Sequence, residues 1–131
     1  MLAIICLQAM RMSRPVSSRP SQIVKQARQR IERIRQVLAG LDYLCSGTLL
    51  SRTKTCGNPG CHCAQDPAAR HGPYYEWTHM KAGKLAHRTL SPQQAQAMRL
   101  AIANYRKAQE LLRDWETETE RLIDAEFPRN R

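Results

Sequence analysis

Residues 56–71 read CGNPGCHCAQDPAARH, and this stretch decides the fold. It places three cysteines and one histidine in the spacing C-x4-C-x-C-x7-H. Structural zinc sites are built from four such ligands at the corners of a tetrahedron. The Gly-Asn-Pro-Gly run between the first two cysteines supplies the turn residues that a short metal-binding loop needs. The sequence therefore predicts one structural Zn²⁺, held by Cys56, Cys61, Cys63 and His71.

The fourth ligand stays open at this point. Cys61 and Cys63 are two residues apart, so in an extended segment they share a side and His62 points away, which favours His71. Cys45 is the reserve candidate if the start of the preceding strand lies beside the loop. Reduced cysteines without any metal are the remaining alternative. Four protein ligands close a site to water and substrate. We therefore expect a structural metal rather than an enzyme, although an open coordination position would support a metal-dependent one.

Outward from this loop, three short segments alternate as strands do. They cover residues 48–54, 73–79 and 85–90, and the last two are separated by a natural turn at residues 81–84. The order predicts a small three-stranded antiparallel meander over residues 46–90. The metal loop lies between its first two strands and resembles a zinc knuckle.

Two long helices flank the meander, over residues 21–40 and 92–125. Ser21 is a candidate N-cap and Gly40 a candidate end for the first, while Ser91, Pro92 and Gln94 form a predicted capping box for the second. Both carry apolar heptads, which predict an antiparallel helical pair in an α+β fold; a seam shared with another copy of the chain is the alternative. The first seam consists of Val24, Ala27, Ile31, Ile34, Leu38 and Leu41. The second consists of Met98, Ala101, Tyr105, Ala108, Leu112, Trp115, Thr119 and Leu122.

The length of 131 residues predicts one domain, over residues 21–131. Residues 1–20 are expected to form a disordered basic arm. The alternative is that the start codon has been assigned too far upstream and that the real start is Met10 or Met12. No run of 18 apolar residues exists, so no membrane partner is expected. Five cysteines, an odd and tightly clustered set, argue against a disulfide framework and favour a cytoplasmic location.

The net charge of +10 is uneven along the chain. Residues 1–90 hold 14 Lys/Arg against 4 Asp/Glu, whereas residues 91–131 hold seven of each. Nucleic acid is the most common partner of such a basic segment. We expect Tyr75 and Trp77 to pack on the helices and Tyr74 to be exposed for stacking on a base. The expected nucleic-acid surface comprises Arg52, Lys54, Arg70, Tyr74, Lys81, Lys84 and Arg88.

Several of these segments resemble a family of small uncharacterised bacterial and archaeal proteins that carries only a domain-of-unknown-function label. The resemblance rests on Gly47-Thr48-Leu49, Arg52, the run from Cys56 to Ala64, His71-Gly72-Pro73-Tyr74-Tyr75 and Asn104-Tyr105-Arg106. It covers about residues 21–125. Members are sometimes found near transposase or other mobile-element genes, so the resemblance implies a link to DNA but brings no established activity.

Two functions follow from these patterns. The first is a small zinc-stabilised protein that binds nucleic acid, DNA in particular, and that serves a mobile element, as the resemblance implies. The alternative is a scaffold module whose heptad helices bind a second copy or another protein, with a metal that only holds the fold.

Overall fold

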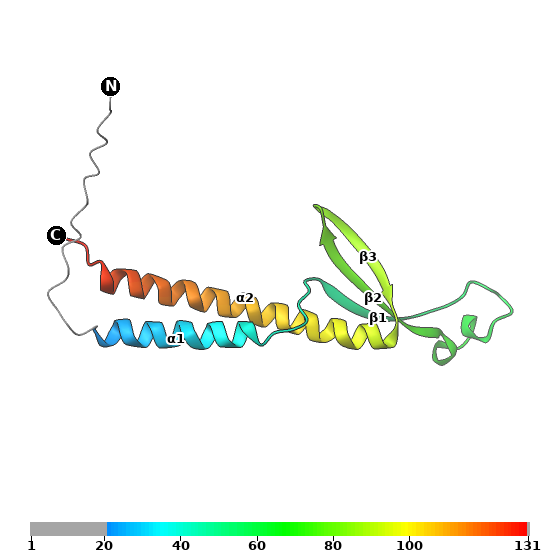
Figure 1. Cartoon of the computed structure of the whole chain (residues 1–131). Helices are drawn as coiled ribbons and strands as arrows, with labels where there is room; N and C mark the ends of the chain where they lie inside the picture. The colour runs from blue at the N-terminus through cyan, green and yellow to red at the C-terminus, as the bar shows by residue number, and fades with distance from the viewer. Residues whose placement is uncertain (1–20, 131) are drawn as a thin grey trace, which may run out of the picture.

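The computed structural model describes residues 21–130, and it shows an α+β fold of two helices and a three-stranded antiparallel sheet (Figure 1). The expected arm or upstream start at residues 1–20 lies outside the described residues. Two short 3₁₀ helices, η1 and η2, lie in the loop between β1 and β2. The elements in chain order are α1 (Gln22–Ala39), β1 (Thr48–Lys54), η1 (His62–Ala64), η2 (Pro67–Ala69), β2 (His71–Lys81), β3 (Lys84–Leu90) and α2 (Pro92–Glu126).

The predicted caps of both helices are confirmed. The Ser21 hydroxyl accepts a hydrogen bond from the Val24 N–H at 3.3 Å, and α1 ends immediately before Gly40. At the start of α2 the Ser91 hydroxyl accepts from the Gln94 N–H, while the Gln94 side chain accepts from the Ser91 N–H. These reciprocal bonds satisfy two backbone donors that the first turn of a helix leaves free.

Helix α1 lies alongside the second half of α2, with its start near the end of α2 (Figure 1). Arg28 pairs with Glu126, and Arg30 lies 3.0 Å from the carboxylate of Glu118. Glu118 is buried, which is tolerable because Arg121 also contacts it at 3.4 Å. The buried apolar residues of α1 are Val24, Ala27 and Ile34.

One residue of the expected second seam lies elsewhere. Leu112 is 50% exposed, whereas its neighbour Leu111 is half-buried and Glu118 is buried. Seven residues turn an α-helix about 20° short of two full turns, so a heptad row drifts around a straight helix. In addition, the first half of α2 packs against the sheet and the second half against α1, so the buried face changes direction along the helix.

The central strand of the sheet is β2, with β1 and β3 on either side. Tyr75 and Trp77 lie opposite Leu90 and Arg88 of β3, and the guanidinium of Arg99 from α2 lies 5.5 Å from the centre of the Tyr75 ring. This face therefore packs on α2, as expected. We call the other side the open face because it carries large apolar side chains that are 38–61% exposed: Leu50, Tyr74, Met80 and Leu85.

Strand β2 is longer at both ends than the sequence indicates. It begins at His71 and continues to Lys81, which pairs directly with Lys84. The expected four-residue turn is thus a two-residue turn at Ala82 and Gly83, both with positive φ. Such a turn matches the twist of a hairpin, so pairing extends to the last residues before it.

The connection between α1 and β1 is hydrogen-bonded to α2 and to β2. Asn104 of α2 donates its amide N–H to the Tyr43 carbonyl at 2.8 Å, and the Trp77 indole N–H donates to the Ser46 carbonyl at 2.9 Å. Gly47 follows with φ +113°, and a Cβ there would lie 2.6 Å from the Trp77 Nε1. Glycine is therefore required at this point, where the chain passes close to the Trp77 indole nitrogen and the Thr78 carbonyl.

Among the described residues, no helix combines the length and the hydropathy that a membrane crossing demands.

We predict that Gly47→Ala lowers the free energy of unfolding by about 3 kcal/mol or more, because it adds a steric clash to the backbone strain. The control is Gly83→Ala, which also has positive φ but no atom within 4 Å of the new Cβ. It should cost only about 1–2 kcal/mol. Urea unfolding followed by circular dichroism measures both, and equal losses would contradict the role given to Gly47.

Candidate metal centre

The loop that joins β1 to β2 extends beyond the sheet, away from the helices (Figure 1). Lys54 of β1 pairs with His71, the first residue of β2, so the two ends of the loop start side by side. Cys56 lies two residues beyond Lys54 and is thereby brought next to His71. Cys61 and Cys63 return to the same place through the η1 turn, in which Cys63 becomes buried.

The ligand atoms of Cys56, Cys61, Cys63 and His71 all lie within 4.8 Å of one another. The sulfur atoms of Cys56 and Cys63 are 3.6 Å apart, and the Cys61 sulfur lies 3.4 Å from the His71 Nε2. In a tetrahedral zinc site, metal–ligand lengths of about 2.3 Å for sulfur and about 2.0–2.1 Å for nitrogen place neighbouring ligand atoms about 3.6–3.8 Å apart. The cluster therefore fits a tetrahedral metal ion after its widest separations shorten by about 1 Å.

Backbone hydrogen bonds organise the loop around the sulfurs. The Cys56 N–H points at the Cys63 sulfur at 3.5 Å, and the Asn58 side chain accepts from the Gly60 N–H at 3.0 Å. The Asn58 carbonyl also accepts from the Cys61 N–H, which closes the turn between the first two cysteines. Asn58 is a residue whose role the sequence analysis missed, although asparagine before Pro-Gly is a known turn signal.

Among the alternatives for the fourth ligand, His71 is the one that joins the cluster. His62 is directed to solvent, with 77% of its side chain exposed, and its Nε2 lies 3.5 Å from the Asp66 carboxylate. Cys45 is held elsewhere, since its N–H donates to the Ala101 carbonyl of α2. The expectation of an extended segment from Cys61 to Cys63 is wrong, because η1 is a 3₁₀ turn. This turn nevertheless directs the His62 side chain outward, as expected.

The thiols differ in acidity. The pKa of Cys61 is lowered, first because its sulfur accepts from the Cys63 N–H and further because the Cys63 and Cys56 thiols are close. For Cys63, the Cys56 N–H acts to lower the pKa, but the Cys61 thiol and burial outweigh it, and the pKa is raised. Cys61 is therefore the more readily ionised of these two thiols. Thiolate is the form that binds metal, and a bound cation displaces the remaining protons.

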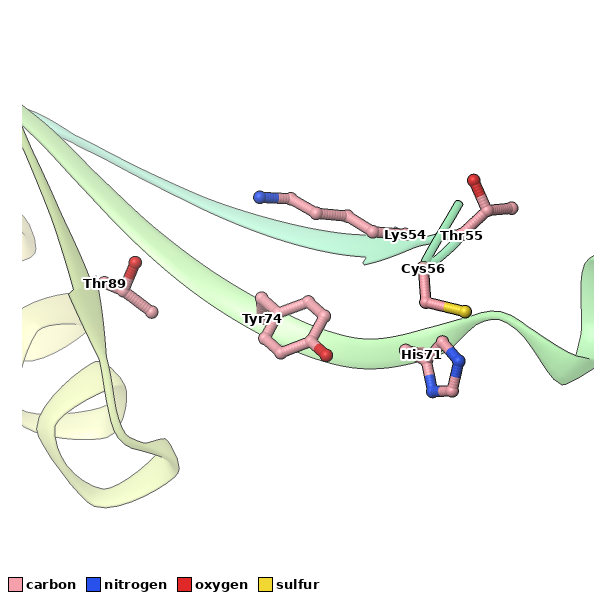
Figure 2. A pocket seen from close by; sticks show the side chains of 6 residues that line it. All are labelled: Lys54, Thr55, Cys56, His71, Tyr74 and Thr89. Carbon is pink, nitrogen blue, oxygen red and sulfur yellow. The ribbon is translucent and has the colours of Figure 1, made fainter. Parts of the chain in front are cut away.

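A shallow hollow of about 210 Å³ adjoins the cluster (Figure 2). In Figure 2 the Cys56 side chain is directed towards the His71 ring at one end, and Tyr74 lies between that end and Thr89. The Lys54 ammonium lies 5.8 Å from the centre of the Tyr74 ring, so both side chains belong to the open face. Thr55 and Thr89 complete the lining, and nothing in the sequence pattern marks either residue.

The expected nucleic-acid residues do not form one surface. Arg52 lies opposite Tyr74 in the β1–β2 register, so Arg52, Lys54 and Tyr74 share the open face, and the exposed Arg70 immediately precedes His71. Arg88 lies opposite Trp77, and Lys81 opposite Lys84, in register positions that belong to the α2-facing side. The expectation that Arg88 shares one surface with Arg52 and Tyr74 is wrong, because side chains alternate between the faces of a sheet.

The open face also carries a carboxylate near its centre. Glu76 lies 3.1 Å from the His87 Nδ1, and the Thr78 hydroxyl lies 3.0 Å from the same nitrogen. Both contacts are made to one ring nitrogen, so the three residues do not form the relay of a nucleophilic triad, in which two different nitrogens serve the acid and the nucleophile.

Comparison with known protein families gives one match for the chain. Residues 24–99 match the model of a domain of unknown function, DUF6788. The chain belongs to this family. The match confirms the expected membership of a family of unknown function, and it includes both the metal cluster and the whole sheet. No curated protein matches the chain, and neither does any solved structure.

We predict one metal ion per chain in purified protein. Cys63→Ser should abolish stoichiometric binding because this buried sulfur is adjacent to the other ligands, whereas Cys45→Ser should leave it unchanged. His71→Ala should weaken metal binding at least about 10-fold, while His62→Ala should not. Elemental analysis and competition with a chromogenic chelator measure these values.

Chelation of the wild-type protein should lower its melting temperature, since the metal stabilises only the folded loop. Metal content well below one per chain, or equal effects of His62→Ala and His71→Ala, would contradict the assigned ligand set.

Proposed function

We propose that this member of DUF6788 is a zinc-stabilised nucleic-acid-binding module. The observation that carries the proposal is the joint placement of Arg52, Lys54 and the exposed Tyr74 on the open face, directly beside the Cys₃His cluster. Arg70 adds a fourth polar group on the chain entering β2. Cations next to an exposed aromatic ring are the recurrent elements of surfaces that bind nucleic-acid strands.

The metal is proposed to be Zn²⁺, with a structural role. Three cysteines and one histidine are a ligand set that zinc commonly occupies, and four protein ligands leave no coordination position for substrate. We therefore assign no enzymatic activity to the cluster. Its contribution is to fix the ends of β1 and β2, and with them the positions of Lys54 and His71.

Charge supports the same assignment. The excess of Lys/Arg over Asp/Glu lies entirely within residues 1–90, which include the open face. Glu76 is the one carboxylate of β2, and Arg52, Lys54 and Arg70 outnumber it around Tyr74. A phosphate backbone passing over Arg52 and Lys54 would place its bases near the Tyr74 ring.

The ring of Tyr74 favours unpaired bases. It is 42% exposed at the hollow, and an aromatic face can stack only on a base that has left its own stack. A duplex offers phosphates to Arg52 and Lys54 but hides the faces of its bases. We therefore expect a single strand, such as oligo(dT), to bind more tightly than a duplex of the same length.

Neutralising the cations tests the proposal. In the zinc-loaded protein, Arg52→Gln/Lys54→Gln should weaken oligonucleotide binding at least about 10-fold and reduce the salt slope of log Kd by about 1.5–2, as expected for two lost phosphate contacts. Fluorescence anisotropy over a salt series measures both values.

The matched control is Lys81→Gln/Lys84→Gln, which removes the same charge at the far end of the β2–β3 hairpin. It should change the affinity much less. Binding that does not depend on salt, or equal losses for the two pairs of substitutions, would rule out the open face as the site.

Substitution of Tyr74 tests stacking separately from charge. Tyr74→Ala should weaken single-strand binding about 5- to 100-fold, Tyr74→Phe should retain it, and duplex binding should hardly change. Loss of single-strand affinity with Tyr74→Phe as well would show that the hydroxyl, rather than the ring, makes the contact.

A further inference from the structure

The Cys₃His cluster contains two neighbouring thiols that differ in their access to solvent. Cys56 is exposed, whereas Cys63 is buried, with 2% of its surface accessible. Their sulfur atoms nevertheless lie 3.6 Å apart, and the Cys56 N–H also points at the Cys63 sulfur. An exposed thiol beside a buried one suits a reversible disulfide, because the first can react with a dissolved oxidant and the second can then displace the product.

The third thiol, Cys61, is placed differently. Its sulfur lies 3.4 Å from the His71 Nε2, and a disulfide from Cys61 to Cys63 would have to span a single residue within the η1 turn. A disulfide bond is about 2.05 Å long, so the sulfurs of Cys56 and Cys63 would each move by about 0.8 Å to form one. Residues 57–60 between them are all exposed, so this segment can follow the movement.

We propose that Cys56 and Cys63 are a redox modification site, at which a peroxide forms a disulfide and thereby releases the metal. The peroxide transfers one oxygen to the Cys56 sulfur, which gives a sulfenic acid and one water. The Cys63 sulfur then attacks the Cys56 sulfur, the S–S bond forms and a second water leaves. Two electrons pass from the two sulfurs to one peroxide. In the metal-loaded protein both sulfurs are thiolates, so two protons come from solvent as the cation leaves. A thiol reductant such as glutathione reverses the reaction by thiol–disulfide exchange.

The reaction removes half of the ligand set. Cys61 and His71 alone would leave the cation with two protein ligands, whereas a structural zinc site uses four. Within residues 55–70 only Cys63 is buried, so the loop has little else to hold it once the metal has left. The loop extends away from the helices (Figure 1), so the packing of α1 on α2 should survive oxidation. The change is therefore local to the loop and the strand ends.

The surface proposed to bind nucleic acid borders this loop. Lys54 pairs with His71, and Tyr74 lines the same hollow as Cys56. Oxidation should therefore weaken oligonucleotide binding, and reductant with zinc should restore it; this one consequence rests on the proposed function. Disulfide formation and zinc release do not depend on it, so the two ideas can fail separately.

Peroxide treatment of the zinc-loaded full-length protein tests the proposal. In the presence of a chromogenic chelator we expect release of about one zinc per chain, with an unchanged helical circular dichroism signal. Free thiols are then blocked with N-ethylmaleimide, the disulfide is reduced, and the freed thiols are labelled with iodoacetamide. Fragmentation of the tryptic peptide 55–70, which holds all three cysteines of the cluster, should place iodoacetamide on Cys56 and Cys63 and maleimide on Cys61.

Single variants test the assigned pair in metal-free protein, so that their weaker metal binding does not interfere. Cys61→Ser keeps both partners and should form the intramolecular disulfide within about 3-fold of the wild-type rate. Cys56→Ser removes the exposed partner and should form any intramolecular disulfide at least about 10-fold more slowly. The matched control is Cys45→Ser, which lies outside the cluster and should release zinc under peroxide as the wild type does.

Three results would overturn the proposal. They are zinc that stays bound when peroxide has oxidised the cluster, iodoacetamide on Cys61 in place of Cys56 or Cys63, and equal oxidation rates for Cys56→Ser and Cys61→Ser.

Discussion

The closing of the loop between β1 and β2 depends on three sulfurs and one imidazole rather than on a hydrophobic core. Within residues 55–70 the only buried residue is Cys63, and it is surrounded by the other ligand atoms. A loop of this length without apolar burial gains too little to offset the conformational entropy of ordering it. Three thiolates in contact also repel one another unless a cation neutralises them. A metal ion bound at the cluster would resolve both difficulties at once, and the role proposed for it is therefore to fold the loop.

The sheet above this loop is covered on one face only. Tyr75, Trp77 and Leu90 direct their side chains towards α2, and the opposite face keeps Tyr74 and Arg52 accessible. A sheet of three strands needs only one packed face for stability, provided that a helix supplies it. The second face is therefore free for binding. Its most basic and aromatic part lies next to the Cys₃His cluster. Under the proposed function, the binding side chains would be held on strands whose ends the metal fixes.

Helix α2 serves more neighbours than its length first indicates. Its 35 residues span about 52 Å, whereas the 18 residues of α1 span about 27 Å. The first half of α2 meets the sheet and the second half meets α1, and the buried side of the helix turns between them. Because the buried side changes, Leu112 and Ile123 contact neither the sheet nor α1 closely and stay about half exposed. Leu112, which the single heptad seam was expected to bury, thus stays at the surface.

The sequence by itself determined the elements and the candidate ligands. Ser21, Ser91 and Gln94 marked the helix starts because capping is a local hydrogen-bond pattern, and the cysteine spacing indicated the cluster because a metal loop is short. Only the tertiary structure decided which residues meet. The strand register placed Arg88 on the face away from Arg52. Packing of α2 against two different neighbours left Leu112 exposed. The η1 turn, rather than an extended segment, directed His62 outward. Local patterns report interactions within a turn or two of chain, whereas faces, registers and neighbours are set by contacts between segments that are distant in sequence.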